Sequence, residues 1–236
     1  MTMEQTKAKR GWKAAGASAG RAGAARRKFG TTSEFAEAFP EHPGRRMSEK
    51  EFLGWVKERT RAEWTEGEVT IMSPVSVDHD ELQNWFVRLL GDFVEERGAG
   101  KVCGSELYVR LPRPAGLRLP DLFFVSTAAL GGFERNAFVG APDLIVEIVS
   151  RDSIHRDYVE KLSHYESSGV KEYWIVDPLS QRVTVWELNR GRYRAIAEKG
   201  AAVHSRVLKG FFVRPGTLWR RPLPSVAGAL REMGAK

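Results

Sequence analysis

The chain has 236 residues, 42% of them hydrophobic, with 12 Phe and 7 Trp, which suffices for one ordinary domain with a buried core and an appendage. The formal net charge is +7, yet residues 1–46 hold ten Lys and Arg against four acids, whereas residues 47–236 hold 27 basic and 26 acidic residues. Residues 47–236 are therefore nearly neutral. The overall charge excludes no class of partner, and it gives no evidence for a polyanionic partner such as a nucleic acid.

Cysteine usage and hydropathy limit the expected compartment. Cys103 is the only cysteine, so no internal disulfide can form and a reducing cytoplasm is the natural location. No apolar run approaches the roughly 18 residues that span a bilayer, and the N-terminus has charge without the apolar stretch of a secretory signal. We expect a cytoplasmic protein without a membrane partner.

Residues 1–46 are rich in Ala, Gly, Lys and Arg and show little apolar periodicity, which predicts a disordered basic tail. Three interpretations stay open: a solvated tail, an arm that binds DNA or RNA nonspecifically, or a segment that is not translated because synthesis starts at Met47. Met47 directly precedes a clear helix start, which supports the third interpretation.

A short helix and a hairpin come first in the body of the chain. Ser48 and Glu51 fit a capping box, with Ser48 as the N-cap of a helix that ends near Arg59. The segment Ala62–Met72 then predicts a hairpin whose turn holds Glu66-Gly67.

A long helix follows, with Asp78 as the predicted N-cap and Glu81 completing a second capping box. Gly98 ends this helix. Apolar residues recur at helical spacing in between: Leu82, Trp85, Phe86, Leu89, Leu90 and Phe93. His79 lies one turn before Leu82, on the buried side. A histidine there is more often a hydrogen-bonded residue of the helix start than a ligand, and capping alone explains Glu81.

Three strands are predicted next, over Lys101–Leu111, Leu117–Ser126 and Asp143–Ser150. Proline within a strand signals an edge, a bulge or a strand start, so Pro120 places Asp121 where the chain enters the sheet. The third strand is almost wholly β-branched or aliphatic, as expected of a central strand covered on both faces. Its one interior carboxylate, Glu147, needs a cation, a metal or a catalytic task to offset its burial.

A helix over Ile154–Ser168 is capped by Asp152 or Ser153 and stopped by Gly169. Its inner face is predicted from four residues at spacings of three and four: Ile154, Tyr158, Leu162 and Tyr165. Lys161 borders that face, and its ammonium can reach a carboxylate while the stem lies along apolar surface.

The remaining elements complete an α/β fold with a central mixed sheet flanked by helices and additional hairpins. A strong strand and its hairpin partner are followed by two weaker strands: Val170–Asp177, Arg182–Leu188, Arg192–Ala197 and Arg206–Phe212. From Pro215 the chain is predicted to be loop and a short closing helix.

Two carboxylates on neighbouring strands, Asp121 and Glu147, would make a site of hard oxygens suited to Mg²⁺ or Mn²⁺. Such a metal polarises a phosphodiester and lowers the pKa of an attacking water. A nearby lysine, Lys161, can orient that water or stabilise the charge that develops.

Three residues resemble the active-site triad of the Uma2 family of endonucleases, which have the restriction-endonuclease-like PD-(D/E)XK fold. They are Asp121 in Pro120-Asp121, Glu147 in VEIVS and Lys161 in DYVEKLSHY. The likeness runs from about Met47 to Leu188, through MSEKEFLGWV, EWTEGEVTIMSPVSVDH, RLPDLFFVS, APDLIVEIVSRDS and GVKEYWIVDP. It implies a nuclease-like domain over residues 47–215, followed by a C-terminal loop and short helix over residues 216–236.

The superfamily's acid-x-lysine triplet is absent, because Val149 occupies the lysine position. The resemblance implies that the lysine function lies on the following helix, at Lys161. It also matches His79 to a family position at the start of the long helix, with Glu81 as a weaker candidate there. The implied site thus has Asp121 and Glu147 on the metal, with Lys161 and His79 in support.

Other acids have simpler explanations. Asp143 repeats the Pro-Asp dipeptide and shares a face with Glu147, but four residues along a strand is about 13 Å, too far for one shared metal. Asp177, before Pro178, fits a strand-end turn. The structural alternative for the whole set is a buried ion pair of Glu147 with Lys161, with Asp121 only ending a loop.

The leading functional hypothesis is a metal-dependent endonuclease acting on DNA, and the resemblance implies a product with a 5′-phosphate. A non-catalytic nucleic-acid-binding or regulatory module on the same fold is the alternative, favoured by the neutral body and the missing triplet. A metal-dependent hydrolase of another substrate is a third hypothesis. Cutting both strands usually calls for two sites, so a homodimer is expected, although no segment identifies an interface.

Overall fold

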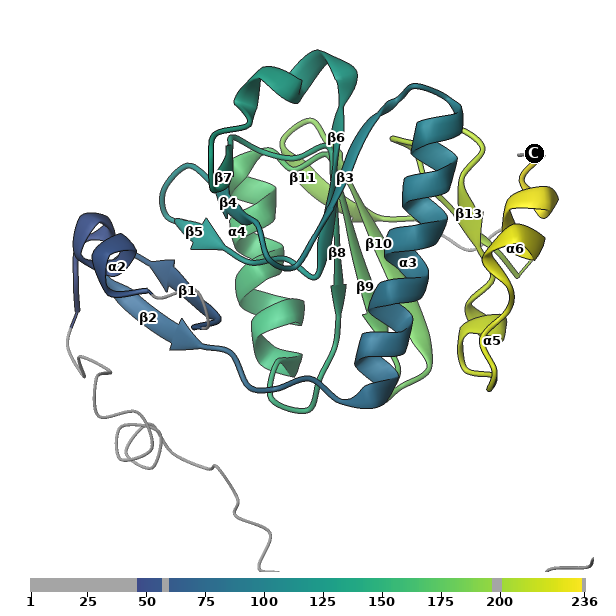
Figure 1. Cartoon of the computed structure of the whole chain (residues 1–236), viewed down its shortest axis with the longest axis horizontal. Coiled ribbons are helices and arrows are strands. Elements are labelled where there is room, and N and C mark those ends of the chain that lie inside the picture. The colour runs from purple at the N-terminus through teal and green to yellow at the C-terminus, as the bar shows by residue number, and fades with distance from the viewer. Residues whose placement is uncertain (1–45, 57–59, 197–200, 235–236) are drawn as a thin grey trace, which may run out of the picture. The chain divides into compact units, whose positions relative to one another are not determined.

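The described fold begins at the helix whose capping box is visible in the sequence. The computed structural model describes residues 46–56, 60–196 and 201–234 (Figure 1). Helix α2 (Glu49–Trp55) starts at Ser48, whose hydroxyl accepts the N–H of Glu51 while the Glu51 carboxylate accepts the N–H of Ser48. The predicted helix end near Arg59 lies outside the described residues, as does the predicted tail over residues 1–46 apart from its last residue.

A five-stranded sheet carries the predicted hairpin, with Glu66 and Gly67 in its turn at φ values of 48° and 94°. Both residues of a type I′ hairpin turn need positive φ, which explains the glycine. The strands stand in the order β2-β1-β5-β4-β7, antiparallel except for β4 with β7. They are β1 (Ala62–Thr65), β2 (Glu68–Ile71), β4 (Tyr108–Arg110), β5 (Leu117–Arg118) and β7 (Ala137–Val139).

A six-stranded sheet forms the centre of the fold, in the order β11-β10-β9-β8-β6-β3. The pair β8–β9 is parallel and the other pairs are antiparallel, so the sheet is mixed as predicted. The strands are β3 (Gly100–Gly104), β6 (Leu122–Ser126), β8 (Leu144–Ile148), β9 (Glu172–Asp177), β10 (Arg182–Asn189) and β11 (Arg192–Ala195).

Two of the predicted strands are wrong because each is two separate strands, and one of these divisions determines where Asp121 lies. The segments 101–111 and 117–126 each divide into two strands that belong to different sheets, β3 with β4 and β5 with β6. The second division falls at Pro120, which has no N–H to donate to a ladder. Asp121 therefore precedes β6 at the junction of the two sheets, close to where the sequence places it.

Helix α3 (Val77–Glu96) buries the predicted apolar stripe but starts earlier than predicted. Ser76, not Asp78, is the N-cap, because its hydroxyl accepts the N–H of His79 at 3.2 Å. Asp78 is exposed and pairs with Arg221 at 3.1 Å. Serine and aspartate are both good N-cap residues, so residue type alone did not decide between the two positions.

The crossover helix after β8 contains a π-helical segment, η2 (Arg156–Glu160), which runs into α4 (Lys161–Ser168). Gly169 ends α4 in the left-handed conformation at φ 87°. The predicted inner face is confirmed at Tyr165, which is buried, and at Tyr158 and Leu162, which pack against the same core. It is wrong at Ile154, which is 46% exposed, and it omits Asp157 and Lys161, which are buried. A π turn adds a residue to the helical repeat, so the buried positions recur every four residues and bring Lys161 from the border of the face to its centre.

Helices cover both faces of the six-stranded sheet (Figure 1). On β8, Val146 packs in the core under α3, whereas Ile145 and Val149 pack with Tyr165 of α4. The short 3₁₀ helix η1 (Thr127–Gly132) links β6 to β7. The predicted α/β architecture, a central mixed sheet flanked by helices with additional hairpins, is confirmed.

The C-terminal part packs against α3. The predicted strand over Arg206–Phe212 is wrong, because the Glu172 carboxylate accepts the N–H groups of Arg206 and Val207 and holds that segment as a loop. This loop joins β12 (Val203–His204) to β13 (Phe212–Val213), and two helices follow, α5 (Pro215–Leu218) and α6 (Val226–Glu232). Among the described residues no helix is both long and apolar enough to cross a membrane.

Candidate active site

Asp121 and Glu147 lie opposite each other on neighbouring antiparallel chain segments. Leu122 pairs with Val146 in the β6–β8 ladder, so one further step along the register brings Asp121 opposite Glu147. Side chains at directly opposite positions share a face, with Cβ atoms about 4.5–5.5 Å apart. The Asp121 carboxylate also accepts the N–H of Ile148 at 2.7 Å, which fixes it against β8.

His79 and Lys161 complete the set of four residues singled out in the sequence. His79 Nε2 lies 3.1 Å from the same Asp121 oxygen, Oδ2, that accepts the Ile148 N–H. Lys161 Nζ lies 2.9 Å from Glu147 Oε1. The structure therefore brings all four side chains into one buried cluster, assembled from α3, the start of β6, β8 and α4.

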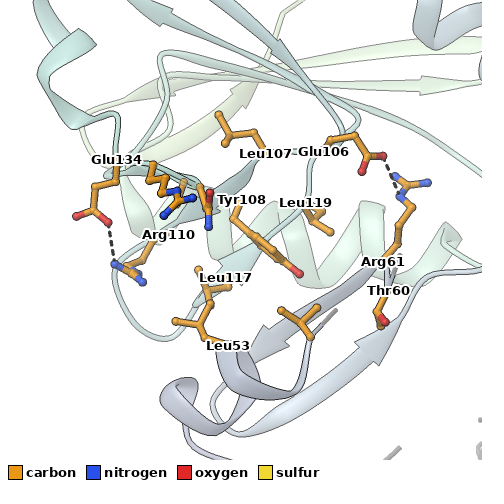
Figure 2. Close-up of a pocket in the computed structure, with 14 residues that line it drawn as sticks. Leu53, Thr60, Arg61, Glu106, Leu107, Tyr108, Arg110, Leu117, Leu119 and Glu134 are labelled. Carbon is orange, nitrogen blue, oxygen red and sulfur yellow. Dashed lines mark hydrogen bonds and ion pairs between the residues drawn. The ribbon is translucent and has the colours of Figure 1, made fainter. Parts of the chain in front are cut away.

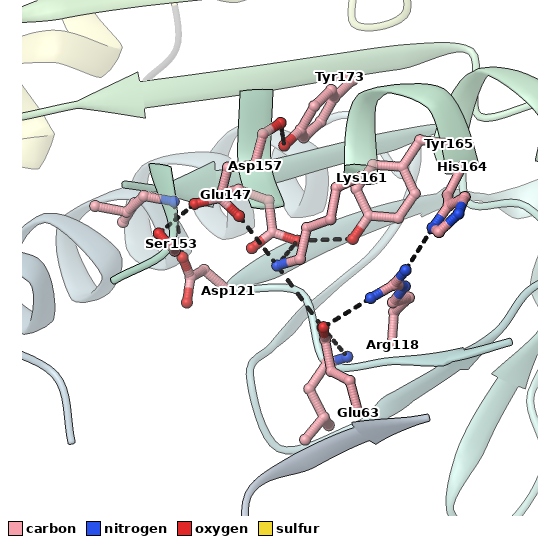
Figure 3. Close-up of polar contacts among 12 residues, drawn as sticks. Glu63, Arg118, Asp121, Glu147, Ser153, Asp157, Lys161, His164, Tyr165 and Tyr173 are labelled. Carbon is pink, nitrogen blue, oxygen red and sulfur yellow. Dashed lines mark hydrogen bonds and ion pairs between the residues drawn. The ribbon is translucent and has the colours of Figure 1, made fainter. Parts of the chain in front are cut away.

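Two further carboxylates surround the Lys161 ammonium, and sequence reasoning missed both. Asp157 Oδ1 lies 3.4 Å from Nζ and Glu63 Oε1 lies 3.7 Å from it. Tyr165 donates its hydroxyl to Glu147 at 2.7 Å. Figure 3 shows the ammonium between carboxylates supplied by three elements, β1, β8 and η2. We call Glu63, Asp121, Glu147, Asp157 and Lys161 the carboxylate cluster.

Glu63 ties the hairpin to the cluster. It is fully buried in β1, where it accepts hydrogen bonds from Arg118 Nη1 at 3.0 Å and from the N–H of Leu119 at 3.1 Å. The second guanidinium nitrogen of Arg118 contacts His164 Nδ1. The signal that could have found Glu63 is a charged residue within a predicted strand, between Ala62 and Trp64, which the structure buries.

The cluster holds more buried negative than positive charge. Four buried carboxylates (Glu63, Asp121, Glu147, Asp157) face two buried cations, Lys161 and Arg118, with half-buried Arg156 adding a third positive charge. Such an excess is costly in a low-dielectric interior unless protons or a cation neutralise it.

The pKa shifts show how this excess is distributed. Burial raises the pKa of Glu147 to about 8, opposed by Lys161 and reinforced by Asp121 and other nearby carboxylates. Burial also opposes ionisation of Glu63, yet the charges of Lys161 and Arg118 lower its pKa to about 2. The Lys161 pKa is raised above its usual value, because Glu147 and Glu63 outweigh the effect of burial. Lys161 and Glu63 thus remain ionised, and Glu147 is the carboxyl group that most readily holds a proton.

His79 responds to its carboxylate partner. Burial alone would lower its pKa, but the hydrogen bond and the charge of Asp121 raise it. Gln83 donates its side-chain amide to the Asp121 carbonyl at 2.8 Å. Asp121 is therefore held at its carboxylate by His79 and at its backbone by the next turn of α3.

The donor set fits a hard divalent cation. Within the described ranges, no group of three or more His, Cys, Asp or Glu side chains is placed to hold a metal ion. Asp121 and Glu147 would instead form a two-carboxylate site completed by water, a mode that Mg²⁺ accepts because it retains several waters. A cation bound there would take the place of the proton that the raised pKa of Glu147 otherwise favours.

The other acids have structural contacts. Asp143 pairs with Lys171 at 2.5 Å and accepts the N–H of Ser126, at the end of β8 away from Ile148. Glu81 is exposed and pairs with Arg221 at 3.2 Å on the surface.

Asp177 holds the turn after β9. Its carboxylate accepts the N–H groups of Leu179 and Ser180 and the hydroxyl of Tyr158. These contacts agree with the turn role expected from its place before Pro178.

Comparison with a solved structure shows the fold. The crystal structure of a "putative nuclease belonging to DUF820" from Anabaena variabilis is 20% identical in sequence, with a TM-score of 0.64 over 73% of this chain and 97% of that chain. The predicted restriction-endonuclease-like fold is therefore confirmed. The comparison with curated proteins finds no match.

Comparison with family models identifies the family. The model of the Uma2 family, described as "Putative restriction endonuclease", matches residues 49–214. That range includes all four residues of the sequence-predicted site and most of the described fold. The chain belongs to the Uma2 family.

Proposed function

We propose that this protein is a metal-dependent endonuclease that hydrolyses phosphodiester bonds in DNA. The observation that carries the proposal is the convergence of Asp121, Glu147 and Lys161, with the ammonium 2.9 Å from the Glu147 carboxylate. Membership of a family described as restriction endonucleases supports the nuclease class.

Asp121 and Glu147 would hold Mg²⁺ or Mn²⁺, which supplies Lewis-acid polarisation of the phosphodiester and a lowered pKa for the attacking water. His79 and the Ile148 N–H orient Asp121 by occupying its Oδ2 atom. Lys161 keeps its proton and stabilises the negative charge that develops on the phosphate oxygens. Glu63 and Asp157 hold the lysine in place.

Burial of the site favours a second candidate. The four sequence-predicted residues are at most 7% exposed, so a nucleic-acid backbone reaches their side chains only after local rearrangement. A nucleic-acid-binding or regulatory module that has kept the fold without turnover needs no such access. The two candidates differ in whether the chain binds metal and cuts.

Plasmid nicking tests the choice. Purified full-length chain is incubated with supercoiled plasmid and Mg²⁺ or Mn²⁺, beside an EDTA control and the variant Glu147→Gln. Asp143→Asn is the matched control, because it changes a buried acid at the other end of the same strand. We expect nicking with metal only, loss in Glu147→Gln and retention in Asp143→Asn.

Two results decide against the proposal. Nicking that persists in Glu147→Gln rejects this site, and absence of both nicking and metal binding by calorimetry supports the non-catalytic module. The expected homodimer is tested separately by the molar mass of the chain in solution, with and without DNA.

A further inference from the structure

A cavity of about 760 Å³ adjoins the five-stranded sheet, between α2, the start of β1 and the edge formed by β4 and β7 (Figure 2). Its volume falls within the range of ligand pockets, roughly 300–1,000 Å³. Leu53, Leu117 and Leu119 give it an apolar wall. Three arginines, Arg61, Arg110 and Arg135, outnumber the two acids of the lining, Glu106 and Glu134, and give it a net positive charge. A ligand with a flat apolar part and an anionic part matches this lining.

The cavity and the carboxylate cluster share a wall. Leu119 lines the cavity, and its backbone N–H donates to Glu63 at 3.1 Å. Arg61 also lines the cavity, and its positive charge reaches His79, whose pKa it lowers against the larger effect of Asp121. A ligand seated in the cavity would therefore lie beside the proposed metal site.

Buried polar atoms without a hydrogen bond occur in the cavity lining and in the cluster beside it. Eight buried side-chain polar atoms in the described part of the chain have no hydrogen-bond partner, and six of them belong to the cavity or to residues in or beside the cluster. The six are Arg61 Nε, His79 Nδ1, Arg110 Nε, Arg118 Nε, Arg156 Nε and Asp157 Oδ1. Three of these atoms, Arg61 Nε, Arg110 Nε and Asp157 Oδ1, lie 3.9, 2.9 and 3.4 Å from a charged partner. Buried groups without a partner cost free energy, so the other three, which lie in or beside the cluster, favour a polar ligand or water there.

Two of the cavity arginines, Arg61 and Arg110, pair with acids near the cavity. Arg61 Nε lies 3.9 Å from the exposed carboxylate of Glu106. Arg110 Nε lies 2.9 Å from Glu49 without hydrogen-bond geometry, and its Nη1 is 3.4 Å from Glu134. The two arginine side chains are 27% and 33% exposed and their acids are more exposed still. Partly exposed ion pairs contribute little stability, so an incoming phosphate can replace them at small cost.

We propose that the cavity receives one unpaired nucleotide of a nucleic-acid strand, next to the phosphodiester bound at Asp121 and Glu147. This inference rests on the proposed function. Arg61 donates to the phosphate of that nucleotide, because a guanidinium forms strong paired hydrogen bonds with phosphate oxygens. The base packs on the leucine wall beside Tyr108, whose ring is fixed by the hydrogen bond from its hydroxyl to the Ala62 carbonyl at 2.9 Å.

The cavity thereby defines a substrate class. A base inside a duplex is stacked and paired, and it enters a side-chain-lined cavity only when it is extruded or already single-stranded. The substrate is therefore a strand with an unpaired nucleotide beside the scissile bond, such as a single-stranded segment or a flap.

Binding measured without turnover tests the inference. The full chain in EDTA is titrated into a fluorescein-labelled single-stranded DNA oligonucleotide and into the blunt duplex of the same sequence, by fluorescence anisotropy over a range of salt. We expect the single strand to bind about tenfold more tightly, the scale of one base stacked on protein.

Two variants test the proposed contacts separately, one with the phosphate of the nucleotide and one with its base. Arg61→Gln should weaken single-strand binding and reduce the slope of log affinity against log salt by about 0.7, the value of one phosphate contact. Leu53→Trp should fill the cavity and abolish the preference for the single strand, with the salt slope unchanged. The controls are Arg194→Gln, an exposed arginine on β11, and Leu53→Ala, which leaves the cavity open.

The outcomes separate this inference from the proposed function. Equal affinity for the two DNAs, or a preference that survives in both folded variants, overturns the cavity assignment even if the plasmid is nicked. A preference that depends on Arg61 and Leu53 without nicking under any metal supports the cavity and rejects the nuclease. Thermal melting of each variant shows that a lost preference does not come from unfolding.

Discussion

Replacing Glu63 by glutamine should destabilise the protein by an amount that depends on pH. Glutamine keeps the shape and can still accept the Leu119 N–H, but it removes the negative charge that faces Lys161 and Arg118. A lowering of the pKa from 4.5 to about 2 in the folded state corresponds to about 3 kcal/mol, at about 1.4 kcal/mol per pH unit. We therefore expect Glu63→Gln to lose about 3 kcal/mol of unfolding free energy at pH 7.

The sign of the pH dependence follows from the direction of that shift. Because the folded-state pKa is depressed, the stabilisation by Glu63 is fully present above pH 4.5 and decreases as the pH falls toward 2. The difference between wild type and Glu63→Gln should therefore shrink by about 2 kcal/mol between pH 4.5 and pH 3. Urea unfolding of both proteins at pH 7, 4.5 and 3 measures it.

Glu172→Gln provides a control with the opposite trend. Glu172 is also buried, but burial raises its pKa despite its hydrogen bonds. Its wild-type advantage over glutamine should decrease as the pH rises above the ordinary carboxyl range. A loss below about 1 kcal/mol for Glu63→Gln at pH 7, or a loss that does not change down to pH 3, would refute the reasoning about the cluster.

Three further outcomes are expected. Lys161→Met should lose about 3–5 kcal/mol in urea unfolding, because removing one partner leaves buried carboxylates uncompensated; stability near that of wild type would contradict the contacts assigned to the ammonium. Mg²⁺ at 100 times its Kd should stabilise the protein by about 2.7 kcal/mol, seen as a raised melting temperature; an equal rise in Asp121→Asn would place the metal elsewhere. Gly116→Ala should unfold at lower urea, because Gly116 has φ +69° and its added Cβ would come within 2.3 Å of the Trp64 carbonyl oxygen; an unchanged midpoint would show that the backbone relaxes there.

The sequence predicted correctly those features that depend on residues close together in the chain. The strand around Glu147 is apolar on both faces and bounded by proline, so a charged residue inside it was conspicuous without any knowledge of its neighbours. The capping box at Ser48 and the hairpin turn at Glu66-Gly67 were equally local, because each depends on residues within a few positions of one another.

The missed features depend on contacts between distant segments. Glu63 belongs to the site because the hairpin packs on α4, which residues 62–72 alone do not specify. The division of two predicted strands between separate sheets is likewise a matter of which partners they find. The face of the crossover helix depends on the π-helical segment η2, whose hydrogen bonds differ from those of an α-helix by one residue and leave no clear periodic signal.

The π-helical segment makes residue count, as well as residue identity, a determinant of this lysine's position. A π turn already holds one residue more than an α-helical turn, so a deletion inside η2 can be absorbed by turning it into ordinary α-helix. Adding a residue there would instead turn everything after it by about 100° around the helix axis, and the amine would swing away from its three acidic neighbours while every side chain kept its chemical character. Homologous or designed chains that lengthen the stretch from the end of β8 to Lys161 would need their amine on another residue.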